Sequence, residues 1–236
     1  MQGCSCGKEN TMRRDIDMDQ ISDGKRYTAN DMVRIGCDDC SGCSDCCRGM
    51  GSSILLDPYD AYRLMKGLGC SFDAMLSGDQ GSPLIGLDLA DGLILPHLQM
   101  AGKDEVCSFL NEEGRCRIHE IRPGFCRLFP LGRIYEDGLF RYFHQIHECS
   151  KGGKTKVKIS KWLGIPNLKQ YETFVLDWHD FLEEAGAEAR QKQDPESIKQ
   201  LGMGLLYVFY RKPYDMEQDF YEQFYARLAQ VWERQK

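Results

Sequence analysis

Residues 37–47 read Cys37-Asp38-Asp39-Cys40-Ser41-Gly42-Cys43-Ser44-Asp45-Cys46-Cys47, and this stretch limits the kinds of fold that the chain can adopt. Packing alone does not require five thiols in eleven positions, and the Gly, Ser and Asp between them favour a loop folded around something. Nine of the twelve cysteines belong to one arrangement, which is this run followed by Cys107, Cys116, Cys126 and Cys149. A disulfide framework, zinc and an iron–sulfur cluster are the three uses of such a set.

The cellular compartment of the protein decides whether disulfides or metal sites are expected. The first fifteen residues have no apolar segment of the secretory type, and no run reaches the roughly 18 apolar residues of a membrane helix. We therefore expect a cytoplasmic protein without a membrane segment. In that compartment thiols stay reduced and dense cysteines more often bind metal.

The net charge of the chain limits the kinds of molecule that it could bind. A net charge of -6 and a pI near 5.5 argue against a nucleic-acid-binding surface. The basic run at residues 151–161, KGGKTKVKISK, is interpreted as a solvated, flexible connector. A protein substrate or partner stays open, and the sequence does not indicate an oligomeric state.

The pattern along the chain predicts an α+β fold in three parts. Residues 1–30 are polar and are expected to form an N-terminal arm. Residues 31–160 would form a small metal-centred cysteine-cluster domain with short β-hairpins and helices. Residues 161–236 carry apolar side chains at helical spacing, which predicts C-terminal helices packed on that domain.

Local signals place individual elements. Asp57 and Pro58 predict the start of a helix that ends at Gly67 or Gly69, and a second short helix is expected over 72–76. Strands are predicted at 53–56 and 93–100. In the C-terminal part, helices are expected over about 168–182, from Asp194-Pro195 towards Tyr210, and through 216–232, with their aromatic stripes in the core.

Two hairpins and a helical turn would carry the later cysteines. Residues 106–110 and 115–119 flank one turn, and residues 132–135 and 139–144 flank Glu136-Asp137-Gly138. Between them, Pro123 and Pro130 bracket a turn that contains Cys126. The helix N-terminus, Arg122 and Arg127 are expected to favour a Cys126 thiolate.

Spacing within the cysteine run discriminates between metals. Cys37-x2-Cys40-x2-Cys43-x3-Cys47 copies a ferredoxin ligand pattern, although Arg48 stands where proline is expected. Eight or nine thiols could instead form two zinc sites, but the adjacent Cys46 and Cys47 suit a mononuclear site poorly. His119 and His147 lie near cysteines and are open candidates for additional ligands.

A family resemblance rests on the order of these motifs. Cys40-x2-Cys43-x2-Cys46-Cys47, Cys107-Ser-Phe-Leu, Gly-Arg-Cys116-Arg-Ile-His119 and Arg122-Pro-Gly-Phe-Cys126-Arg127-Leu-Phe129-Pro130 resemble the YkgJ-type cysteine-cluster family, a proposed zinc- or iron-chelating domain that includes flagellin lysine N-methylase. The resemblance covers roughly residues 37–150. It implies a metal-ligand set of Cys40, Cys43, Cys46, Cys47, Cys107, Cys116, Cys126 and Cys149, with Cys37 as an extra thiol.

Three functional hypotheses follow. The first is a metal-binding protein that carries a cysteine-ligated [4Fe–4S] cluster, which we prefer to zinc. The second, implied by the resemblance alone, is a cluster-dependent lysine N-methyltransferase that uses S-adenosylmethionine, although the chain has no Gly-rich strand–turn–helix for such a cofactor. The third is a structural zinc module whose helices bind another protein. Whether the protein is an enzyme stays undecided.

Overall fold

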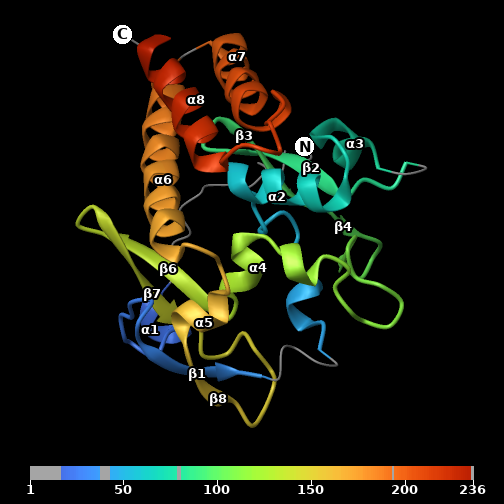
Figure 1. The fold of residues 1–236 in the computed structure, drawn as a ribbon, viewed down its shortest axis with the longest axis vertical. Coiled ribbons are helices and arrows are strands. Elements are labelled where there is room, and N and C mark those ends of the chain that lie inside the picture. The colour runs from blue at the N-terminus through green and yellow to red at the C-terminus, as the bar shows by residue number, and fades with distance from the viewer. Residues whose placement is uncertain (1–16, 38–42, 79–80, 193, 235–236) are drawn as a thin grey trace, which may run out of the picture.

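The structure is a computed structural model that describes residues 17–37, 43–78, 81–192 and 194–234 (Figure 1). Its α-helices are α1 Met18–Ile21, α2 Pro58–Leu68, α3 Phe72–Ser77, α4 Gly124–Leu128, α5 Ile159–Leu163, α6 Leu168–Gln191, α7 Pro195–Leu206 and α8 Phe220–Arg234. Short 3-10 turns lie at η2 Asp45–Cys47 and η3 His119–Ile121, and a π-helical turn, η4 Tyr207–Arg211, continues α7.

The strands form antiparallel pairs rather than one large sheet. Their bounds are β1 Met32–Gly36, β2 Ile85–Ala90, β3 Leu93–Leu98, β4 Met100–Ala101, β5 Val106–Cys107, β6 Leu131–Glu136, β7 Leu139–His144 and β8 Thr155–Lys158. The pairs are β1–β8, β2–β3, β4–β5 and β6–β7. The predicted α+β class with a C-terminal helical segment is therefore confirmed.

Strong local signals place α2 and α3 as the sequence predicts. The Asp57 carboxylate accepts from the N–H of Asp60, the Asp60 carboxylate accepts from the N–H of Asp57, and Pro58 occupies the first turn. Gly69 ends α2 in the left-handed conformation at φ 65°, which suits glycine. The predicted helix over 72–76 corresponds to α3, capped by Ser71.

The three C-terminal helices bury their aromatic stripes against one another, as expected. The Trp178 ring of α6 lies edge-on to Phe209 of η4 and to Phe224 of α8, with centroids 5.0 and 5.9 Å away. Figure 1 shows α6 and α8 side by side with α7 next to them, and α7 and α6 also contact β3. One continuous hydrophobic cluster joins these helices to α2 and the strands.

Three predicted strand regions differ from the structure. The hairpin around Glu136-Asp137-Gly138 is confirmed as β6–β7. In place of the hairpin predicted for residues 106–110 and 115–119, the structure has a single bridge between Leu110 and Cys116. Val106 and Cys107 pair instead with β4, beyond the break at Gln99 that divides the predicted 93–100 strand. The proposed strand at 53–56 is likewise one bridge, from Leu55 to His97.

The interpretation of residues 151–161 as a flexible connector is wrong over its second half. Thr155–Lys158 forms β8 against β1, and Ile159, fully buried, begins α5. The partner strand lies about 120 residues earlier in the chain, so local composition gave no sign of the pairing. Residues of the expected N-terminal arm also contact the sheet, since Ser22 and Tyr27 bridge to Gln145 and Tyr142.

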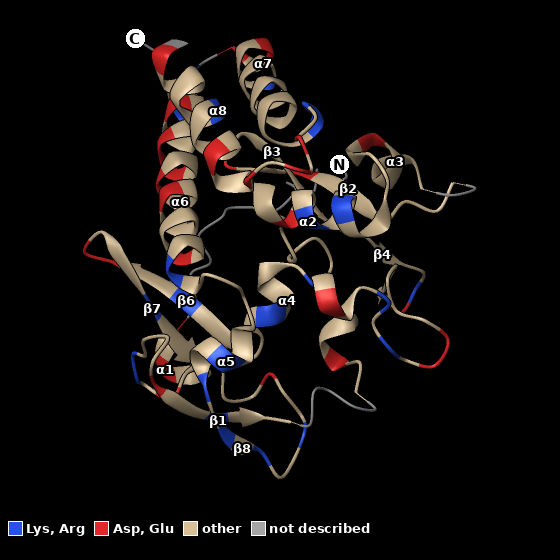
Figure 2. Ribbon diagram, viewed as in Figure 1, with Lys and Arg blue, Asp and Glu red and all other residues tan. Residues whose placement is uncertain are grey.

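No helix in the described ranges is both long and apolar enough to cross a membrane. Charge is unevenly distributed over the surface (Figure 2). Acidic residues line the outer side of α6, whereas Lys and Arg gather around β1, β8 and α5.

Candidate metal centre

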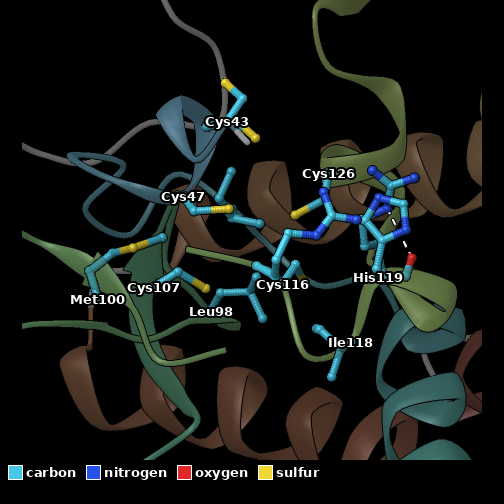
Figure 3. A pocket seen from close by; sticks show the side chains of 13 residues that line it. Cys43, Cys47, Leu98, Met100, Cys107, Cys116, Ile118, His119 and Cys126 are labelled. Atoms are coloured by element: carbon cyan, nitrogen blue, oxygen red, sulfur yellow. Dashed lines mark hydrogen bonds between the residues drawn. The ribbon is translucent and has the colours of Figure 1, made fainter. Parts of the chain in front are cut away.

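Six cysteines from separate parts of the chain line one cavity of about 40 Å³, measured as the space open to the centre of a water-sized sphere. One water needs about 10–15 Å³ by this measure, so the cavity is larger than a single-water void. Figure 3 shows Cys47, Cys107, Cys116 and Cys126 around a shared space, with Cys43 farther out. The full lining is Cys43, Cys46, Cys47, Ile54, Leu98, Met100, Cys107, Arg115, Cys116, Ile118, His119, Arg122 and Cys126.

Short elements deliver these thiols from three directions. Cys46 and Cys47 lie on η2, which follows the Gly- and Ser-rich run, and Cys107 ends β5. Cys116 lies at its bridge to Leu110, next to the turn at Asn111. Cys126 is the third residue of α4, as predicted from the proline pair. Irregular backbone lets the thiols of neighbouring segments face the same space.

The thiols influence one another strongly. The Cys47 S–H donates to the Cys46 sulfur, which lowers the pKa of Cys46 and, together with burial, raises the pKa of Cys47. Burial also raises the pKa of Cys107 and Cys116, and that of Cys126 well above its usual range. Without a cation these four thiols with raised pKa therefore favour the protonated state, and a bound metal would displace those protons.

The expectation that Arg122 and Arg127 favour a Cys126 thiolate does not match the described contacts. Arg127 donates to the carbonyls of Glu120, Arg122 and Leu163 and so fixes the backbone instead. Arg122 lines the cavity, but the thiols on which its charge acts are Cys46 and Cys116, whose pKa it lowers. At Cys46 the hydrogen bond from Cys47 has the larger effect, and at Cys116 burial has the larger effect. For Cys126 burial dominates.

Helix α2 forms the platform on which the segment from Cys116 to Cys126 rests. The Asp60 Oδ1 atom, in a residue 2 % exposed, accepts from the Gly124 N–H at 2.8 Å. Arg63, one turn along, donates to the carbonyls of Glu120 and Arg122. Gly67 lies so close to Ile121 that a Cβ would come within 2.4 Å of its Cδ1 atom. Asp60, Arg63 and Gly67 of α2 thus position this segment.

The structure places the remaining predicted residues differently. Cys40 lies outside the described residues. Cys149 and Cys37 do not belong to the cavity lining, although a hydrogen bond from Ser150 to Asp45 brings the neighbour of Cys149 to η2. His119 lines the cavity with its Nε2 atom buried, whereas His147 is exposed. Ligation by any of these residues stays a prediction.

The donor set fits a sulfur-ligated metal group. Thiolates select zinc, Cu(I) and iron–sulfur clusters, and six of them surround this cavity. No three Cys, His, Asp or Glu side chains within the described ranges form a ready site for a single ion. The sulfurs are therefore distributed around a space instead of meeting at one point.

Sequence reasoning missed the supporting residues Asp60, Arg63 and Gly124. The spacing of Asp57 and Asp60 is visible in the sequence as a capping pair, but it predicts a helix start and gives no sign that Asp60 also reaches α4. That contact joins residues 64 positions apart.

Residues 39–149 match a protein-family model, CxxCxxCC, described as "Putative zinc- or iron-chelating domain". The matched region contains all six cysteines that line the cavity. No curated protein and no solved structure matches the chain.

Proposed function

Because residues 39–149 match the CxxCxxCC family model, whose description is zinc or iron chelation, we propose that this chain carries a cysteine-ligated iron–sulfur cluster of the [4Fe–4S] type. The ligands would come from the proposed set of Cys40, Cys43, Cys46, Cys47, Cys107, Cys116, Cys126 and Cys149. The proposal places the protein in a reducing compartment, where these thiols persist.

The gathering of six thiols at one cavity carries the proposal. A structural zinc ion takes four ligands that must converge on a single point. A cubane binds four thiolates, or three when one iron is open, and its several metal atoms can reach sulfurs that do not converge on a point.

The chain's own residues would shape the properties of the centre. When bound, such a cluster supplies one-electron redox chemistry. Ile54, Leu98 and Ile118 form an apolar part of the cavity wall, which limits access of water. Arg122 lies on the same wall and offsets negative charge on thiolates.

Zinc is the second candidate because His119 shares the lining with the thiols. Imidazole suits zinc, and a site with three sulfurs and one histidine is a common structural zinc set. The chain would then use the metal to hold its segments together. Methyl transfer from S-adenosylmethionine has no supporting observation among the described residues and is not part of the proposal.

Anaerobic purification tests the choice of metal directly. We expect a brown protein with iron and acid-labile sulfide, whose absorbance near ~400 nm is lost in air through oxidation of the cluster. A colourless protein with stoichiometric zinc would overturn the cluster in favour of the second candidate.

Single substitutions test the ligand set. Cys126→Ala and Cys46→Ala are expected to abolish metal binding, and Cys40→Ala to lower it, whereas Cys70→Ala, at a thiol outside the cavity lining, should leave it unchanged. Cys149→Ala should reduce the metal content, and Cys37→Ala should not. Unchanged metal content in both Cys40→Ala and Cys126→Ala would refute the assignment.

A further inference from the structure

One face of the β1–β8 pair carries exposed basic side chains. Residues on one face alternate along a strand, so Met32 and Arg34 of β1 project to the same side as Lys156 and Lys158 of β8. All four are exposed, while Val33 and Ile35 on the other side are buried in the core. We call these four residues the basic face. Figure 2 shows Lys and Arg concentrated around this strand pair.

The basic face places like charges directly opposite one another. Arg34 is the cross-strand partner of Lys156, and Met32 is the partner of Lys158. Like charges at directly opposed positions destabilise an antiparallel pair, so this arrangement lowers the stability of the isolated fold. Met32, with 53 % of its surface exposed, adds an apolar contact beside the charges. The arrangement is better explained by binding than by folding.

No acidic side chain among the described residues forms an ion pair with Arg34, Lys156 or Lys158. The nearest acid in sequence, Asp31, directs its carboxylate to the N–H and hydroxyl of Thr28. Arg34 donates to the carbonyl of Lys154, which holds its guanidinium along the edge of β8. Five lysines and no acid occur between residues 151 and 161, so the positive charge continues beyond the strand.

Both strands connect directly to cysteine-bearing segments. β1 ends at Gly36, next to Cys37, and β8 begins six residues after Cys149. The Lys154 ammonium also donates to the carbonyl of Cys149. A molecule bound on the basic face would therefore lie beside segments that lead towards the candidate metal centre.

We propose that the basic face is the docking surface for an acidic segment of a partner protein. Its cations complement carboxylates, and Met32 supplies the apolar contact that a protein segment can use. A protein segment is favoured over nucleic acid because Met32 offers it an apolar contact, and the four residues of the face include no aromatic ring on which a base could stack. The proposal does not depend on which metal the cavity holds.

Fluorescence anisotropy with labelled poly-L-glutamate tests the docking surface on the full-length protein. The test variant is the triple Arg34→Gln/Lys156→Gln/Lys158→Gln. The matched control, Lys103→Gln/Lys169→Gln/Lys199→Gln, removes the same charge at three exposed lysines elsewhere. We expect the wild type to bind in a salt-sensitive manner, the test triple to bind more weakly on the order of tenfold, and the control to bind within about twofold of the wild type.

Two further measurements separate this proposal from its competitors. The test triple should keep the metal content of the wild type and be at least as stable to urea, because like-charge repulsion is relieved. Equal losses in both triples would overturn the docking surface. Two other results would also overturn it: tighter binding of a thymidine oligonucleotide, or of phosphatidylserine vesicles, than of poly-L-glutamate at equal charge concentration. In either case the binding would have to be lost in the test triple. Unchanged binding of poly-L-glutamate by the test triple would likewise overturn the docking surface, whatever the metal content of that variant.

Discussion

The buried carboxylate of Asp60 accepts a hydrogen bond from the backbone N–H of Gly124 at 2.8 Å and so joins the start of α2 to the start of α4. Asp60→Ala would leave that N–H without a partner and weaken the cap of α2. We expect a loss of about 2 kcal/mol in the free energy of unfolding and a lower metal content, because Cys126 lies two residues beyond Gly124.

Urea denaturation and metal analysis of the same preparations check this expectation. Asp73→Ala is the control, since Asp73 is exposed and pairs only with Arg211 at the surface. Its effect should stay within about 0.5 kcal/mol. Equal effects of the two substitutions would remove any special role for Asp60.

Gly124 is held tightly between α2 and α6. A Cβ at this position would lie 2.2 Å from the Tyr171 Oη atom and 3.5 Å from Cζ. Gly124→Ala should therefore destabilise the protein by about 1–3 kcal/mol through overpacking. Adding Tyr171→Phe removes the clashing oxygen and should recover part of that loss, as measured by thermal unfolding of both single variants and the double variant. Strict additivity of the two single effects would contradict this explanation.

Arg122 supplies the positive charge on the cavity wall. If the centre is an iron–sulfur cluster, Arg122→Gln should lower its reduction potential, because the cation favours the more negative reduced state. Arg141→Gln is the matched control, since Arg141 is exposed and does not belong to the lining. Protein-film voltammetry of both variants gives the comparison, and equal potentials in the two would refute the role of Arg122.

Asp57 links stability to pH. Burial raises the pKa of its carboxyl from its ordinary value of 3.8 to about 6, so between these values the folded state holds a proton that the unfolded state has lost. This contribution to stability is complete below about pH 4 and is lost as the pH rises through about 6. Asp57→Asn keeps the capping oxygen and cannot titrate.

Between about pH 4 and pH 7 the wild type should therefore lose on the order of 2 kcal/mol of unfolding free energy relative to Asp57→Asn. Urea denaturation of both proteins at several pH values measures the difference, and any loss of metal at low pH affects both. A difference that is constant from pH 4 to pH 7 would show that Asp57 has an ordinary pKa.

Elements with strong local signals could be predicted from the sequence. Asp57 with Pro58 defined one end of α2, and Glu136-Asp137-Gly138 identified the β6–β7 hairpin, because capping and turn geometry depend on neighbouring residues. The pairing of β8 with β1 and of β5 with β4 could not be predicted. Those pairings are chosen by tertiary contacts, and the Lys-rich run around β8 has the composition of a loop.

The candidate site also has a part that could be predicted from the sequence and a part that could not. Residue type and spacing identified the thiols, and the structure brings together six of them, including Cys46, Cys107 and Cys126. The supports of the site were not visible, because hydrogen bonds such as those from Arg63 to the carbonyls of Glu120 and Arg122 join segments far apart in the chain and leave no motif. Which thiols share a metal depends on such supports.

The cavity thiols come from two stretches of chain, residues 43–47 and 107–126, with roughly 60 residues between Cys47 and Cys107. A metal group held by both would act as a reversible cross-link that closes the intervening loop. Closing a loop of that length removes conformational freedom mainly from the unfolded chain. Loss of the metal would then release both stretches at once.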